Sequence, residues 1–280
     1  MAGSIEAPKK TLDKTVLCPD EPTDLARAGL RIARLAYPDL DESFYLAELD
    51  RLAARLRERI AGVADLHRPA EAMARLLCEE EGFRGNSEDY HDPDNSYLNR
   101  VLDRRTGIPI TLSLVYMEVG RRAGLTVQGI GLPGHFIIGL YGSEGRILMD
   151  PFYRGTVLDE EECRRRVAVQ YGGSKVFGAH LLNPAGPKEM LVRLLRNLKG
   201  IYIQMDERMK ILHLIEWITV IDPNAAGEFK QRGLIYEHMG GLDLAVRDLE
   251  KYLSLAPEAQ DAQAIRSMIE KLKKETSGLH

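Results

Sequence analysis

The sequence predicts an α+β protein with a helical N-terminal region, a core that contains an antiparallel sheet, and an all-α C-terminal region. Two observations support this fold class. Apolar residues recur at helical spacing towards both ends of the chain, whereas residues 107–150 hold one helical segment followed by three short β-rich segments separated by turns. We divide the 280 residues into a flexible arm (1–21), a helical lead-in with the core (22–183) and a helical domain (184–280).

The N-terminal region is predicted to be helical after the polar arm. Residues 1–21 contain charged residues and prolines without apolar periodicity, as loose chain termini do. Amphipathic helices are expected between residues 25 and 80, and their apolar positions should face the core: Leu25, Ala28, Ile32, Leu46, Leu49, Leu52, Leu56, Ile60, Met73, Leu76 and Leu77. Such stripes indicate packing, and no chemistry is visible in this part of the chain.

Side chains that can bind metals gather in the next loop, at Asp89, His91, Asp92 and Asp94. A calcium loop counted from Asp92 would place Tyr97 where glycine is needed, and Asp103 where glutamate is preferred. We therefore interpret the acidic residues as caps of turns and of a short helix, and predict neither a metal nor a cofactor.

Residues 107–150 form the predicted centre of the core. Pro109 suits the first turn of a helix, an apolar stripe follows over residues 112–119, and Gly124 suits the helix end. The β-rich segments then cover residues 125–132, 136–141 and 146–149. His135 opens the second of these strands and Asp150 closes the third, so an antiparallel hairpin would bring the two side chains together.

A histidine paired with a carboxylate is the orienting half of a nucleophilic triad, because the acid fixes the imidazole tautomer and stabilises its charged form. A thiol would be expected at the N-terminus of the core helix, where the helix dipole lowers its pKa. No cysteine lies between Cys78 and Cys163, and the hydroxyls available there are Thr106, Thr111 and Ser113. On the residues alone, the preferred interpretation of His135 is a partly buried histidine whose hydrogen-bond acceptor in the hairpin is Asp150.

The C-terminal domain is predicted to follow the loop at residues 183–187. Residues 224–257 fit one tetratricopeptide unit in the spacing of their aromatic, small and terminating residues: Phe229, Gly233, Tyr236, Ala245 and Pro257. Residues 188–223 resemble a degenerate repeat, and a final helix is expected over 262–274. So short an array is expected to serve either as a peptide-binding groove or as a structural brace.

Composition narrows the classes of function. The formal charge of −4 gives no reason to expect nucleic acid or an anionic membrane as a partner, and the arginines at 164–166 lie beside acidic residues, which predicts a solvated helix face. Three separated cysteines argue for a reducing compartment and against a disulfide framework or a zinc site. No apolar segment is long enough to span a membrane, so we expect a cytoplasmic protein.

The segments GIPIT, RRAGL, PGHF and MDPF, in this order, resemble the transglutaminase-like core. Together with GFRGN and NSYLNRVLDRRTGIPITLS they resemble in particular the bacterial SirB family, over about residues 22–275. The resemblance implies a papain-like α+β core followed by tetratricopeptide-like repeats. His135 matches the family's catalytic histidine and Asp150 its aspartate, but the position of the catalytic cysteine falls between Pro109 and Thr111, where no cysteine stands.

Two hypotheses of function follow. The first is a non-catalytic protein that binds a protein or peptide partner or regulates it, and that retains an inherited His135–Asp150 dyad. The alternative is a hydrolase or acyltransferase in which Thr111 or Ser113 serves as the nucleophile. We expect the cleft to be lined by polar and aromatic residues near the dyad, although the asparagines are equally suited to capping a helix: Asn95, Asn99, Pro109, Tyr153 and Arg154.

Overall fold

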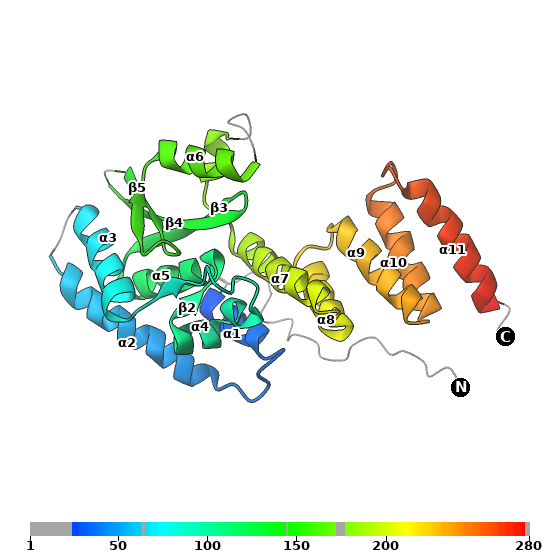
Figure 1. Cartoon of the computed structure of the whole chain (residues 1–280), viewed down its shortest axis with the longest axis horizontal. Coiled ribbons are helices and arrows are strands. Elements are labelled where there is room, and N and C mark those ends of the chain that lie inside the picture. The colour runs from blue at the N-terminus through cyan, green and yellow to red at the C-terminus, as the bar shows by residue number, and fades with distance from the viewer. Residues whose placement is uncertain (1–23, 63–64, 144, 172–176, 278–280) are drawn as a thin grey trace. The chain divides into compact units, whose positions relative to one another are not determined.

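The computed structural model describes residues 24–62, 65–143, 145–171 and 177–277. The chain divides into two compact units, one formed by residues 18–194 and the other containing residues 195–280, and each is considered by itself (Figure 1). The arm predicted at residues 1–21 lies outside the described residues. The predicted fold class is confirmed, because helices precede an antiparallel four-stranded sheet and an all-helical region follows it. None of the described helices is long and apolar enough to cross a membrane.

Helices form the N-terminal part of the first unit. Asp24 and Asp41 cap the first two of them by accepting backbone N–H groups, and the predicted stripe of Leu49, Leu52 and Leu56 is buried. The third helix continues directly into a π-helix, η2. The bounds are Leu25–Ala33 (α1), Glu42–Ile60 (α2), His67–Ala74 (α3) and Arg75–Glu80 (η2).

A short parallel pair and a capped loop lead into the central helix. These elements are β1 (Arg84–Gly85), which pairs with β2 (Thr106–Gly107), and between them η3 (Pro93–Ser96) and α4 (Leu98–Arg104). The central helix α5 covers Pro109–Ala123, and every residue in 109–120 is buried. It ends at Gly124, whose φ of 97° is a left-handed conformation that glycine adopts without steric cost.

The sheet has the strand order β3-β4-β5-β6, and each strand pairs antiparallel with its neighbour in the sequence. A two-residue turn, Pro133-Gly134, joins the first hairpin, with Gly134 at a φ of 69°. The bounds are Thr126–Leu132 (β3), His135–Gly142 (β4), Gly145–Asp150 (β5) and Thr156–Leu158 (β6).

Helices cover both faces of this sheet (Figure 1). Helix α6 (Glu160–Tyr171) packs Cys163 and Val167 into a core made by one face of the strands, which includes Ile137 and Leu148. Val127 belongs to the other face and lies against α5, where a Cβ added to Gly120 would come within 2.6 Å of it. Because side chains alternate along a strand, His135 and Asp150 share the face that α6 covers.

The C-terminal unit consists of helices that pack on their neighbours in the sequence, as tetratricopeptide repeats do. Where α9 and α10 meet, a Cβ added to Gly233 would lie 2.9 Å from Leu249, so a small residue is needed there; Ala245 is also fully buried. Asp248 and Arg232 form a bidentate ion pair between the same helices. The bounds are Pro187–Gln204 (α7, which begins in the first unit), Arg208–Ile221 (α8), Ala226–His238 (α9), Leu242–Leu255 (α10) and Ala262–Ser277 (α11).

Candidate functional site

His135 and Asp150 are in direct contact. Nε2 of His135 lies 2.8 Å from Oδ2 of Asp150, and the carboxylate is fully buried whereas the imidazole is partly exposed. The contact follows from the hairpin, since β4 begins at His135 and β5 ends at Asp150 on the same face of the sheet. The second carboxylate oxygen accepts the backbone N–H groups of Phe152 (3.1 Å) and Tyr153 (3.3 Å). The turn after β5 therefore holds the carboxylate in place.

Arg166 also contacts Asp150, so that His135, Asp150 and Arg166 form an array of three residues. This contact corrects the prediction of a wholly solvated arginine face on α6. Its Nη1 donates to Oδ2 of Asp150, the same oxygen that meets His135. Arg164 and Arg165 are exposed as expected, but Arg166 lies beside the buried Cys163 and Val167. The spacing of those two apolar residues, four apart, was a signal that this side of the helix faces the sheet.

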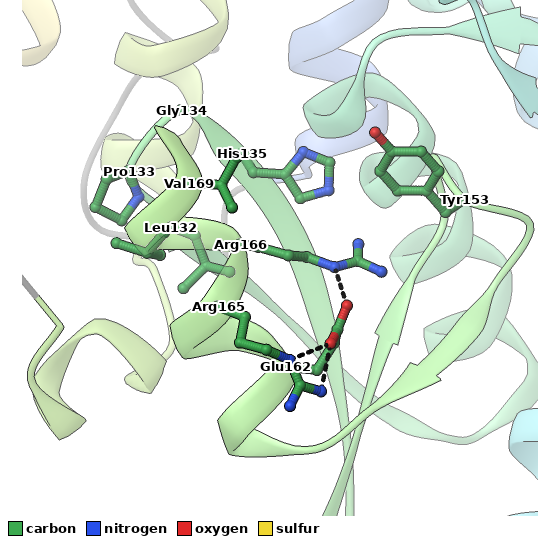
Figure 2. A pocket seen from close by; sticks show the side chains of 10 residues that line it. Leu132, Pro133, Gly134, His135, Tyr153, Glu162, Arg165, Arg166 and Val169 are labelled. Atoms are coloured by element: carbon green, nitrogen blue, oxygen red, sulfur yellow. Dashed lines mark hydrogen bonds and ion pairs between the residues drawn. The ribbon is translucent and has the colours of Figure 1, made fainter. Parts of the chain in front are cut away.

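A cavity of about 460 Å³ opens beside the array (Figure 2). Its lining includes His135, Tyr153 and Arg166, with apolar surface from the turn after β3 and from α6. Glu162 bridges two arginines there, accepting from Nε of Arg165 at 2.9 Å and from Nε of Arg166 at 3.2 Å. These hydrogen bonds hold the pKa of the Glu162 carboxyl below its ordinary value, Arg165 having the larger effect. The wall thus combines exposed aromatic surface with paired charges.

Aromatic rings fix the position of the imidazole. The ring centroid of His135 lies 6.0 Å from that of Phe152, edge to face, and 5.8 Å from that of Tyr153. Phe152 packs so closely on Gly85 that a Cβ there would come within 2.6 Å of the ring. The second glycine of GFRGN and the phenylalanine of MDPF therefore belong to one contact, which brings β1 next to the site.

Arg193 of α7 supports the turn that carries His135. Its Nη2 donates to the backbone carbonyl groups of Leu132 (2.7 Å) and His135 (2.5 Å), and its guanidinium lies over the Phe136 ring at 5.2 Å. No local sequence signal points to this role of Arg193, because the residue lies in a different element, far along the chain from the turn.

The predicted nucleophiles point at backbone carbonyl groups. Oγ1 of Thr111 is buried, donates to the carbonyl of Asn95 at 2.7 Å and accepts the N–H of Ile108 at 3.1 Å, as a helix cap does. Ser113 is fully buried and its hydroxyl lies 3.5 Å from the carbonyl of Phe136. Neither hydroxyl has a hydrogen bond to His135 within the described residues.

The residues expected to line one cleft fall in different places. Tyr153 lines the cavity with His135 and is half exposed. Asn95 is fully buried and braces its own loop, donating to the carbonyl of Asp89 at 2.7 Å. Pro109 is buried as the first residue of α5, and Asn99 lines a separate pocket. Arg154, with a φ of 60°, is exposed and is not among the residues that line the cavity.

The cysteines in the described ranges are poor nucleophiles. Burial raises the pKa of the Cys163 thiol to about 11, and it also raises the pKa of Cys78. In the part of the chain that the structure describes, no group of three or more His, Cys, Asp or Glu side chains lies close enough to hold a metal ion. Asp92 and Asp94 instead pair with arginines: Arg104 lies 2.6 Å from Asp92, and Arg100 lies 3.0 Å from Asp94.

A helix packed on an antiparallel sheet, with a histidine and an aspartate on adjacent strands, is the arrangement expected of a transglutaminase-like protein. Residues 43–196 match the family model described as the transglutaminase-like superfamily, and residues 198–270 match a tetratricopeptide repeat model. The chain belongs to the SirB-like family within this superfamily, with a tetratricopeptide-like C-terminal region.

Relatives cover nearly the whole chain. A UPF0162 protein of Xylella fastidiosa is 36% identical over 264 residues, which cover 93% of this chain and 94% of the relative. Protein SirB1 of Salmonella typhimurium is 26% identical over 86% of this chain and 90% of its own length. The human F-box only protein 21 is 32% identical over 136 residues, 46% of this chain but 21% of that protein. The likeness therefore extends across both units among the bacterial relatives.

Proposed function

We propose that this protein binds a protein or peptide partner at the cavity beside His135, and that it does so without chemical catalysis. One observation carries this proposal: Arg166 and His135 both contact the same carboxylate oxygen, Oδ2 of Asp150. In a catalytic triad the carboxylate stabilises the imidazolium that forms during the reaction. Here a permanent cation already neutralises the carboxylate, so His135 receives less of that stabilisation.

The missing nucleophile supports the same conclusion. The position that the family fills with cysteine lies at the start of α5, and the nearest hydroxyl, that of Thr111, is engaged with the carbonyl of Asn95. To act, Thr111 would have to give up both bonds of its cap and expose a buried oxygen. The His135–Asp150–Arg166 array is better suited to holding the shape of the cavity wall.

The composition of the wall suits a peptide segment. Tyr153 offers an exposed ring, Arg165 an exposed guanidinium, and Pro133 and Val169 apolar surface. Tyrosine and arginine are enriched among residues that dominate binding energy at protein interfaces. The tetratricopeptide-like unit adds a second surface of a kind that generally serves protein–protein interaction.

Site-specific photo-cross-linking tests the binding hypothesis. A benzophenone amino acid would replace Tyr153 on the cavity wall, and a matched variant would carry it at Val157, which is as exposed but does not line the cavity. In cells that produce the full chain, we expect a defined cross-linked protein from position 153 that is absent from position 157 and diminished by Arg165→Glu. Identical products from both positions would refute binding at this cavity.

A second measurement tests the catalytic alternative. Purified protein would be treated with a fluorophosphonate probe, which labels activated hydroxyl nucleophiles, alongside Thr111→Val, Ser113→Ala and His135→Ala variants. We expect no labelling that depends on His135. The proposal would be overturned if the native chain is labelled and if His135→Ala and one of the two hydroxyl variants each abolish this labelling. That result would establish a hydrolase or acyltransferase.

A further inference from the structure

A second pocket lies in the first unit and shares no lining residue with the His135 cavity. Its volume is about 560 Å³, and it is lined by the segment that connects α1 to α2, by the start of α2, and by Asn99 of α4. The lining residues that matter here are Tyr37, Asp39, Asp41, Phe44, Tyr45 and Asn99. Nothing in the proposed function uses this pocket.

Asn99 presents an unpartnered acceptor at this pocket. Residue Asn99 is 3% exposed and lines this pocket. The hydroxyl of the neighbouring Tyr45 gives its single proton to Oδ2 of Asp103 at 3.1 Å, so it does not donate to Asn99. The amide oxygen Oδ1 of Asn99 is buried without a hydrogen-bond partner among the described residues. A buried acceptor without a partner is costly, and a ligand that donates a hydrogen bond removes this cost.

The rest of the wall also attracts donors and cations. Phe44 is 64% exposed and stands edge to face with Tyr45 at 5.1 Å. Asp39 is exposed and forms no hydrogen bond or ion pair with another described residue, whereas Asp41 accepts the N–H of Ser43 to cap α2. Aromatic faces and carboxylates together favour a cation that can both stack and donate.

Neighbouring arginines do not fill this role themselves. Arg34 reaches the carbonyl of Leu40 at 3.3 Å and pairs with Glu42. Arg100 lies over the Tyr37 ring at 5.7 Å but is held by Asp94 and Asp103. Each of these cations has a carboxylate partner of its own, whereas the carboxylates of Asp39 and Asp41 have no cationic partner among the described residues.

We propose that this pocket binds a guanidinium group, as carried by an arginine side chain. A guanidinium is planar and weakly hydrated, so it can lie against Phe44 or Tyr45 while its fixed fork of N–H groups donates to a rim carboxylate. The same fork reaches Oδ1 of Asn99 once the amide of this residue turns toward the pocket. An ammonium is strongly hydrated and stacks less well, and a neutral urea group lacks the charge. The same group can be supplied by a partner peptide or by a free guanidino compound.

Nuclear magnetic resonance of the full chain tests the proposal with matched ligands. The probes are Nα-acetyl-arginine amide, its lysine analogue and its neutral citrulline analogue, and the signal followed is the side-chain amide of Asn99, assigned with Asn99→Leu. We expect saturable shifts with the arginine compound, at a dissociation constant on the order of 1 mM for so small a ligand. The lysine and citrulline compounds should bind at least about fivefold more weakly.

Variants locate the binding. Asn99→Leu removes the acceptor and Asp39→Asn removes an exposed carboxylate that supports no fold contact, so each should weaken arginine binding by about fivefold or more. Glu58→Gln, which removes an equal charge from an exposed position of α2 outside the pocket, should leave binding unchanged. If Asn99→Leu fails to fold, Asp39→Asn still decides the matter.

The outcomes divide clearly. No saturable shift, equal binding of the three ligands, or arginine binding unchanged in both pocket variants would overturn the proposal. Comparison with agmatine, a free guanidino amine, separates the two sources. Tighter binding of the capped arginine indicates a peptide, and tighter binding of agmatine indicates a small molecule.

Discussion

Replacing Asp150 by alanine tests whether this carboxylate holds the site together. The group is fully buried and accepts hydrogen bonds from His135, Arg166 and two backbone N–H groups. Removing one partner of a buried ion pair costs about 3–5 kcal/mol, because the other charge is left uncompensated. A quarter of the Arg166 side chain is exposed and Glu162 remains as its partner, so we expect a loss at the lower end, about 2–4 kcal/mol.

Urea denaturation of the native chain, Asp150→Ala, Arg166→Met and the double variant measures this loss and its origin. The double variant should be less destabilised than the sum of the single changes, by a coupling energy of about 1–3 kcal/mol. His135→Ala should cost about 0.5–1.5 kcal/mol, since it removes one hydrogen bond from a partly exposed ring. The reasoning would be refuted if the Asp150→Ala protein is as stable as the native chain or more stable. Such a result is expected instead of a carboxylate that is held in a strained position for catalysis.

The remaining predictions concern packing, ionisation and the thiols. Gly233→Ala should destabilise the protein by about 1–3 kcal/mol because the new Cβ meets Leu249. The control Gly227→Ala lies in open space on the same helix and should stabilise the protein by about 0.5–1 kcal/mol. Equal melting temperatures of the two variants would contradict the close approach of α9 and α10. Burial raises the pKa of the Glu216 carboxyl. Its contribution to stability is therefore present below the unfolded pKa and is lost as the pH rises through the folded pKa. Glu216→Gln should then raise the melting temperature at about pH 7 but not at about pH 4. Iodoacetamide at about pH 8 should leave Cys163 of the native protein unmodified by intact mass, and rapid modification would show a thiolate that burial does not permit.

The sequence was sufficient to predict those elements whose signals are local. The helix at 109–123 carries its own start at Pro109 and its own stop at Gly124, and the turn at Pro133-Gly134 sets the register of the hairpin. The pairing of His135 with Asp150 depends on the next hairpin, in which β4 and β5 pair antiparallel from Gly142 and Gly145 onwards. These features need only nearby residues to specify them.

Other parts of the site depend on packing between distant elements, which a single sequence does not reveal. Whether Arg166 points to solvent or to Asp150 is decided by how α6 lies on the sheet. Asn99 was expected beside the dyad, but the direction in which α4 faces places it in another pocket. The role of Arg193 depends on where α7 passes the turn after β3. In each case the sequence contains the residue type, but it does not show which residues are its neighbours in space.

The array of His135, Asp150 and Arg166 is drawn from elements that are close in the sequence, namely strands β4 and β5 of the meander and helix α6, which follows β6. Its two bonds join residues that are 15 and 16 positions apart. Closing such short loops costs little chain entropy, and contacts between near neighbours in sequence form quickly during folding. The array thus belongs to the part of the sheet that can form early, and it needs nothing from α5, where the family's nucleophile would stand. Pulse-labelled amide exchange during refolding would read this order directly. A fold whose site also serves its own assembly has a reason to keep a histidine and an aspartate, whether or not the site catalyses a reaction.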